Sequence, residues 1–355
     1  MKICWLGIYR KEYPRNDILL NGLRQNNVEI VECNAGGMER FRYFKLIYKL
    51  LKLKNDYDII YVAFPSQLSV IAAKIFSRKK VVMDAFISMY DAMIYDRKEI
   101  GKFRPRALKF LFLDWLSVFL ADLVITDTEA HRKFWGSWKF INIDKIKVVY
   151  IGVNNAIIKP APTEKKKDNK FLVQFHGNYI PLQGLKKIVE AIDILKNDKS
   201  IKFRLVGWGQ DYDETMNFIK EKKLNEIEII GRIPFIEINK LLNEADIVLG
   251  IFGDTEKSNR VIPNKVYEGL AVAKPVITKD SPAIRELFSE EEIMIIKNTP
   301  EALAEAILTL KDNKELREKI ARNGYRKIKE TLTPKSVANT LIKHLNMLLS
   351  SQKYG

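Results

Sequence analysis

Short apolar runs rich in valine and isoleucine alternate with longer amphipathic segments along the whole chain. An unbroken apolar run of about four to eight residues is typical of a strand that is covered on both faces of a sheet. Strands that alternate with helices predict a parallel sheet with right-handed crossover connections. The sequence therefore predicts an α/β protein with doubly wound, Rossmann-like sheets.

The alternation runs through two stretches of the chain. In the first, strands are predicted at residues 2–8, 28–33, 58–64, 80–85, 122–126 and 146–150, and helices at 20–26, 40–54, 67–76, 108–120 and 128–135. In the second, strands are predicted at residues 171–176, 202–206, 227–230, 246–251, 275–278 and 292–296, and helices at 185–196, 236–243, 265–272, 283–288 and 300–311. Each half is expected to bind ligands at the carboxyl ends of its strands.

The polar, proline-containing residues 160–169 separate the two stretches and have the composition of a linker. A chain of 355 residues accommodates two α/β domains of ordinary size. We therefore predict an N-terminal domain over residues 1–160 and a C-terminal domain over residues 170–333. A last helix is predicted at residues 334–349, where a proline suits the first turn.

Cysteine usage and the apolar stretches bear on the cellular compartment. Cys4 and Cys33 form no cluster with other metal-ligating residues, so we expect free thiols, no metal and no cofactor. We recognise no secretion signal, and Lys109, Asp114 and Asp122 make the longest apolar stretch too charged to span a membrane. A cytoplasmic protein is expected.

The formal net charge of +16 suggests an anionic partner. Residues 40–54 and 102–110 interleave lysine and arginine with aromatic and aliphatic side chains. Such a helix can lie on an anionic membrane surface, which would make the protein peripheral to the inner face of the membrane. Alternatively, it packs on the core and exposes a solvated basic face. Nucleic acid is not expected as a partner, because no recognised nucleic-acid-binding module accompanies the charge.

Candidate ligand-binding residues follow the strand ends of the second half. Glycine turns lie at Gly177 and at residues 207–209 and 231–234, and a basic loop enters a helix near residue 264. Arg260 and Lys265 at this entrance could neutralise a diphosphate together with the helix dipole. Glu268, one turn later, could accept both hydroxyls of a ribose, or it could be a first-turn glutamate that the dipole alone favours.

Several of these segments occur together in one known family. They are Val206-Gly207-Trp208-Gly209, Gly231-Arg232-Ile233-Pro234, Ala245-Asp246-Ile247-Val248 and Pro263-Asn264-Lys265-Val266-Tyr267-Glu268-Gly269. With this order of motifs, the chain resembles the retaining glycosyltransferases of family 4, which have the GT-B fold. The resemblance implies two Rossmann-like domains that face each other across a cleft. It also implies that the C-terminal helix, at about residues 334–355, packs back on the first domain.

The same resemblance implies an activity. A sugar would pass, with retention of configuration, from a nucleotide-diphosphate sugar to a hydroxyl of a glycan or lipid-linked acceptor, such as a polysaccharide precursor. The implied donor site consists of His176, Gly177, Asn178, Gln183, Gly207, Gly209, Arg232, Ile233, Pro263, Asn264 and Glu268. The alternative is a glycosyltransferase-like protein that binds a nucleotide or a glycan without catalysis.

The donor site departs from the family pattern at three charged positions. The family often has two glutamates separated by seven residues; Glu268 matches the second, but Arg260 stands at the first. The usual arginine and lysine of the first turn are replaced by Asn178 and Gln183. We interpret Arg260 and Lys265 as catalytic electrostatic clamps that take over the work of the missing cations.

The first domain is expected to hold the acceptor. Arg10, Tyr13 and Arg15 follow the first predicted strand, and Asp84, Ser88 and Asp91 follow the fourth. Asp84 is a candidate catalytic base, since no histidine occupies this turn. Alternatively, Asp84 and Asp91 only cap local turns.

Overall fold

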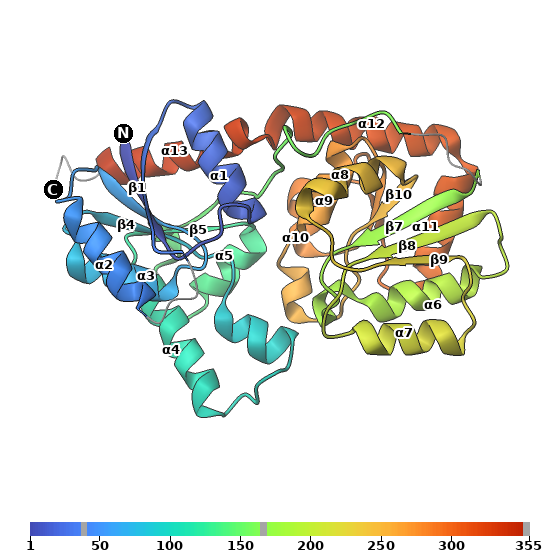
Figure 1. Ribbon diagram of the computed structural model, residues 1–355, viewed down its shortest axis with the longest axis horizontal. Coiled ribbons are helices and arrows are strands. Elements are labelled where there is room, and N and C mark those ends of the chain that lie inside the picture. The colour runs from blue at the N-terminus through green and yellow to red at the C-terminus, as the bar shows by residue number, and fades with distance from the viewer. Residues whose placement is uncertain (37–40, 164–168, 351–355) are drawn as a thin grey trace. The chain divides into compact units, whose positions relative to one another are not determined.

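The computed structural model describes residues 1–36, 41–163 and 169–350 (Figure 1). Arg40, the first residue of the predicted basic helix, and part of the predicted linker lie outside these ranges. The chain divides into two compact units, one formed by Met1–Gly152 with Leu332–Gly355 and the other by Val153–Thr331. Each unit is described by itself.

The first unit is built on a six-stranded parallel sheet with the order β2-β1-β3-β4-β5-β6. Its strands are β1 (Lys2–Gly7), β2 (Glu29–Asn34), β3 (Ile59–Val62), β4 (Lys80–Asp84), β5 (Leu123–Thr126) and β6 (Ile146–Val148). Its main helices are α1 (Pro14–Gln25), α2 (Arg42–Lys52), α3 (Gln67–Phe76), α4 (Pro105–Leu120), α5 (Glu129–Gly136) and α13 (Pro334–Ser350). One core cluster joins α2, α3, α4 and α5 to the sheet.

The C-terminal helix α13 packs against α1, as Figure 1 shows for the red and dark blue helices. The approach is close at Gly22, because a Cβ atom there would lie 2.0 Å from the carbonyl oxygen of Pro334. Val337, Leu341 and Leu345 of α13 are buried. The prediction that the last helix returns to the first half is confirmed.

The second unit has another six-stranded parallel sheet, with the order β12-β11-β10-β7-β8-β9. Its strands are β7 (Phe171–His176), β8 (Ile201–Val206), β9 (Ile227–Ile230), β10 (Ile247–Leu249), β11 (Val276–Lys279) and β12 (Met294–Ile296). Its helices are α6 (Leu185–Leu195), α7 (Tyr212–Glu221), α8 (Phe235–Glu244), α9 (Asn264–Ala271), α10 (Pro282–Leu287), α11 (Pro300–Asp312) and α12 (Lys314–Thr331). The strand order reverses between β7 and β10, which is where doubly wound sheets bind ligands.

The predicted fold class of two parallel Rossmann-like sheets is confirmed. Two helices, α7 and α12, were not predicted. The α12 helix is strongly charged and buries only Ile320, Ala321, Gly324 and Ile328, so its apolar periodicity is weak. In addition, α1 begins at Pro14 rather than at residue 20, so part of the predicted loop after β1 is helical. Among the described helices, none combines the length and the apolar character that a membrane span requires.

Candidate functional site

The end of β7 and the start of α9 form the centre of the candidate site. His176 is the last residue of β7, and Glu268 lies one turn into α9. Nε2 of His176 lies 2.7 Å from Oε2 of Glu268, and both side chains are less than a tenth exposed. The strand end and the helix are therefore tied together at the point where the strand order reverses.

Lys265 is buried beside this pair. Its Nζ donates a hydrogen bond to Oε1 of Gln183 and lies 3.6 Å from the ring centroid of Phe175. Within the described part of the chain, no carboxylate forms an ion pair with it, and burial holds its pKa well below the usual range, with partial compensation from Glu268. A buried amine that is in ion-pair contact with no carboxylate is a natural partner for an incoming anion.

Two turns at the strand ends pack backbone against backbone. A Cβ atom on Gly207, which follows β8, would lie 1.9 Å from the carbonyl oxygen of Gly177, and Gly207 has φ 137°. Only glycine fits this close approach at such a backbone angle. The side chain of Lys265 extends to the Gly177 turn. A Cβ atom on Gly177 would lie 3.0 Å from Nζ of Lys265.

Arg232 and Trp208 meet at the ends of β9 and β8. The guanidinium carbon of Arg232 lies 5.2 Å from the ring centroid of Trp208, whose side chain is half exposed. The sequence predicted Arg232 and the partly buried Ile233 as donor-site residues, but it did not predict Trp208. Its position between Gly207 and Gly209 was the available signal. An exposed indole with a stacked guanidinium can receive a planar ring.

Arg260 and the start of α9 follow a loop that contains the short helix η4 (Glu256–Asn259). Arg260 is 16% exposed and lies 4.0 Å from Glu256. Pro263 and Asn264 begin α9 and are partly buried, while Asn178 is exposed at the surface.

Lys279, at the end of β11, fixes this loop through hydrogen bonds. Its Nζ donates to the carbonyl oxygen of Gly253 at 2.8 Å, to Oγ of Ser258 at 2.7 Å and to Oδ1 of Asn259 at 2.7 Å. Burial lowers the pKa of Lys279 to about 8. Sequence reasoning missed this residue, although a lysine that ends an apolar strand was a visible signal.

Replacing Lys279 with methionine is expected to change the pH dependence of stability. Since the folded-state pKa of about 8 lies below the usual 10.5, the unfolded chain binds more protons between these values. The wild-type protein therefore gains stability as the pH rises through this interval, and Lys279→Met does not. Thermal unfolding at about pH 7.5 and about pH 10 gives the Tm of the wild type minus that of the variant at each pH. This difference should be larger at the higher pH. A pH-independent difference would contradict this account.

The acceptor-side residues of the first unit are mostly interior. Asp84 and Arg15 are fully buried and form an ion pair at 3.2 Å, and Arg15 also donates to the carbonyl oxygen of Val149 at 2.6 Å. Ser88 donates to Asp114 at 2.7 Å and accepts from the backbone N–H of Asp91 at 3.0 Å. These side chains are at most 1% exposed, and their contact with an acceptor stays a prediction.

Arg10 and Tyr13 remain near the surface. Arg10 is exposed, and Tyr13 is partly buried with its ring 5.3 Å from that of Phe64. Burial raises the pKa of the Tyr13 phenol to about 12, so the phenol stays protonated at neutral pH. Among the described residues, no group of His, Cys, Asp or Glu side chains is arranged to hold a metal ion.

Comparison with known proteins adds to this geometry. Residues 158–327 match the family described as glycosyl transferases group 1. An uncharacterized glycosyltransferase of Methanocaldococcus jannaschii is 30% identical over 179 residues, which are 50% of this chain and 47% of that protein. The chain thus aligns with about half of that relative's length. The O-antigen biosynthesis glycosyltransferase WclY of Escherichia coli is 21% identical over 88% of this chain and 90% of its own length.

Two solved structures show the same fold. One is Anabaena HepE in complex with UDP-glucose, with a TM-score of 0.73, 18% identity, and coverage of 98% of this chain and 100% of that one. The other is sucrose-phosphate synthase from Thermosynechococcus elongatus, with a TM-score of 0.75, 12% identity, and coverage of 99% and 100%.

Proposed function

Because the chain belongs, through residues 158–327, to the glycosyl transferases group 1 family, we propose that it transfers a sugar from a nucleotide-diphosphate sugar. The acceptor is a hydroxyl of a glycan or lipid-linked precursor of a polysaccharide, and the anomeric configuration is retained. The donor site is the group of residues around His176, Lys265 and Glu268 at the strand-order reversal.

The observation that carries this proposal is the buried Lys265. Its amine contacts the side chain of Gln183, which occupies the position where related glycosyltransferases have a lysine. The cation is thus supplied from the start of α9 instead of from the turn after β7. At that place the amine and the N-terminal dipole of α9 both favour a diphosphate.

Catalysis by this site is electrostatic. As the bond between the sugar and the diphosphate breaks, negative charge grows on the leaving oxygen, and a nearby cation stabilises it. Lys265 supplies this charge from one side, and Arg260, on the loop that Lys279 holds, supplies it from another. The acceptor hydroxyl attacks on the face that the diphosphate leaves, and a diphosphate oxygen takes its proton.

The nucleoside is bound by two groups of residues beside the diphosphate site. Glu268 accepts hydrogen bonds from the ribose hydroxyls, while His176 fixes the orientation of its carboxylate. Trp208 and Arg232 stack on the base. A uridine diphosphate sugar is the first donor to test, since HepE was solved with UDP-glucose.

The function is tested with uridine, guanosine and adenosine diphosphates and their sugars. One nucleotide series is expected to raise the Tm, because a ligand at about 100 times its Kd adds about 2.7 kcal/mol to the free energy of unfolding. The matching sugar donor is then expected to release nucleoside diphosphate when an acceptor is added. Stabilisation without release would favour the non-catalytic binding protein, and no stabilisation by any nucleotide would contradict both.

Replacing Glu268 with alanine is expected to weaken donor binding about 10- to 100-fold, because a hydrogen bond to a charged group contributes about 1.5–3 kcal/mol. The free energy of unfolding should change by only about 1 kcal/mol, the cost of leaving His176 without its partner. Titration calorimetry and thermal unfolding measure the two effects. Intact binding combined with a large loss of stability would show that Glu268 is structural.

We also propose that the first unit contacts an anionic membrane from the cytoplasmic side. Helix α2 buries Leu46 and Leu50, so part of it packs on the core, as the alternative of a core-packed helix with a solvated basic face required. Tyr43 and Ile47 are partly buried. The remaining large apolar side chains are more than half exposed; they are Phe44, Tyr48 and Leu51, with Phe41 just before the helix. Lysines and arginines accompany them, so binding to phosphatidylglycerol vesicles should fall steeply as salt rises.

A further inference from the structure

Helix α4 buries polar side chains and exposes several large apolar ones, which is unusual for a helix that packs only on its own core. The side chains that it buries are Ala107, Asp114, Ser117 and Val118. Along its outer side, Leu108, Phe112 and Phe119 are about half exposed. Other large apolar side chains of the helix, such as Phe110, Leu113 and Leu116, are partly buried. The exposed three form an apolar stripe, and such a stripe favours an apolar partner on the outside.

The buried polar side of α4 is fully engaged. Asp114 accepts hydrogen bonds from Gln67 at 2.9 Å, from Ser88 at 2.7 Å and from the backbone N–H of Tyr90 at 2.9 Å. This network fixes the rotation of α4 about its axis, because turning the outer residues inward would leave the Asp114 carboxyl group without partners. The outward apolar side is therefore a property of the folded unit.

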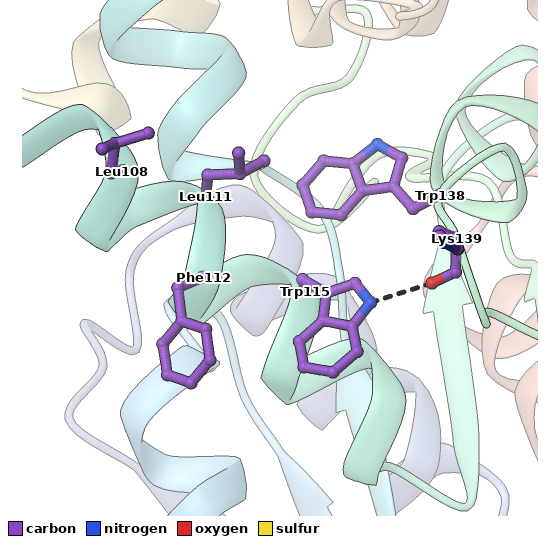
Figure 2. A pocket seen from close by; sticks show the side chains of 6 residues that line it. All are labelled: Leu108, Leu111, Phe112, Trp115, Trp138 and Lys139. Carbon is purple, nitrogen blue, oxygen red and sulfur yellow. Dashed lines mark hydrogen bonds between the residues drawn. The ribbon is translucent and has the colours of Figure 1, made fainter. Parts of the chain in front are cut away.

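A groove lies on this outer side, as Figure 2 shows. It has a volume of about 400 Å³ and is lined by Leu108, Leu111, Phe112, Trp115, Trp138 and Lys139. The indole N–H of Trp115 donates to the carbonyl oxygen of Lys139 at 2.9 Å, so the polar atom of this ring is already satisfied. The wall is thus almost wholly apolar, which fits an occupant that has no hydrogen-bonding groups of its own.

The segment that leads into α4, which lines the groove, is basic. Between residues 98 and 112 the exposed charged side chains are Lys98, Lys102, Arg104, Arg106 and Lys109, with Glu99 as the one acid. Lys139 lies 4.9 Å from the ring centroid of Phe140, and Phe140 and Phe103 are both strongly exposed. Tryptophan and phenylalanine next to lysine stems are typical of a surface that enters the interface of an anionic bilayer.

From these observations we infer that the α4 groove, defined by the six lining residues, seats a hydrocarbon chain of an anionic membrane lipid. The charge around the groove selects the anionic headgroup region, and the apolar wall takes the chain. This inference rests on the proposed membrane contact of the first unit and makes it specific. It is independent of sugar transfer.

The test uses the full chain with Trp208→Phe, because Trp208 is exposed in the second unit while Trp5 and Trp135 are fully buried. Fluorescence from Trp115 and Trp138 is then measured with phosphatidylglycerol vesicles whose acyl chains are brominated or unbrominated. We expect lower emission with the brominated chains, because bromine quenches only an indole that lies among the chains. Vesicle binding with equal emission would leave the membrane contact standing and overturn the seating of a chain in the groove.

The matched variants are Leu108→Ser with Phe112→Ser in the groove, and Ile236→Ser as an exposed apolar control in the second unit. The double variant is expected to lose at least about tenfold in vesicle affinity, because it removes two large apolar side chains that leave water on binding. The control should bind like the wild type. Equal binding of the double variant, or of wild type to neutral phosphatidylcholine vesicles, would overturn the inference. So would a dimer in solution that the double substitution dissociates, which would identify this face as a protein interface.

The stabilisation by nucleotide diphosphates is measured on the same variants. It should be unchanged in Leu108→Ser with Phe112→Ser, because the groove belongs to the first unit and the donor site to the second. A lost vesicle interaction with intact nucleotide binding therefore separates failure of the groove from failure of the donor site.

Discussion

Replacing Lys265 with methionine is expected to lower kcat by about 10²- to 10³-fold, the usual effect of removing one group that stabilises developing negative charge. Methionine fills a similar volume, so the packing against Phe175 is largely kept. The free energy of unfolding should stay unchanged or rise. The wild-type protein buries the Lys265 amine without an ion pair to any described carboxylate, and the variant removes that cost. Loss of activity without loss of stability would identify a functional residue.

The protonation of Lys265 gives a second measurement. Burial depresses its pKa in the unliganded protein, and a bound diphosphate would raise it again, so donor binding should take up a proton. Calorimetry in buffers with different ionisation enthalpies detects this proton, and the uptake should vanish in Lys265→Met. Lys279→Met is the matched control, since it also removes a buried lysine of the second unit, but one that already has three acceptors. Proton uptake that persists in Lys265→Met would exclude the assigned role.

The architecture and the two segments that meet in the proposed donor site were predictable from the sequence, because both depend on local pattern. The apolar run at β7 and the basic entrance to α9 each show in a few consecutive residues. The parallel sheet then brings the two together, since His176 and Glu268 lie 92 positions apart in the chain but meet at one strand end. The contact between Lys265 and Gln183 was not predictable, because it depends on how a flexible side chain crosses the Gly177 turn.

Other features escaped prediction because periodicity does not tell which side of an element is buried. A helix was predicted at residues 108–120, but the sequence did not show that Asp114 is buried while Phe112 is exposed. The local sequence was also insufficient to show the surroundings of Asp84. A carboxylate at a strand end is equally compatible with catalysis and with an ion pair, and the sequence does not show that Arg15, 69 residues away, lies beside it.

Replacing Asp84 with alanine is expected to destabilise the first unit by about 3–5 kcal/mol, because the variant leaves the fully buried guanidinium of Arg15 without its counter-ion. The guanidinium stays charged, since its pKa is far above neutrality. Chemical denaturation measures the loss as a shift of the midpoint at unchanged slope. Catalytic loss in the folded fraction at unchanged stability would instead support Asp84 as the candidate base.

The double variant Arg15→Met with Asp84→Leu distinguishes a broken ion pair from a damaged core. Replacing both buried charges with apolar side chains of similar size is often neutral for stability, so the double variant should recover most of what Asp84→Ala loses. The carbonyl oxygen of Val149 still loses its donor, which limits the recovery by about 1 kcal/mol. If the double variant instead stays as unstable as Asp84→Ala, the stabilisation comes from the shape of this part of the core and not from the pairing of the two charges.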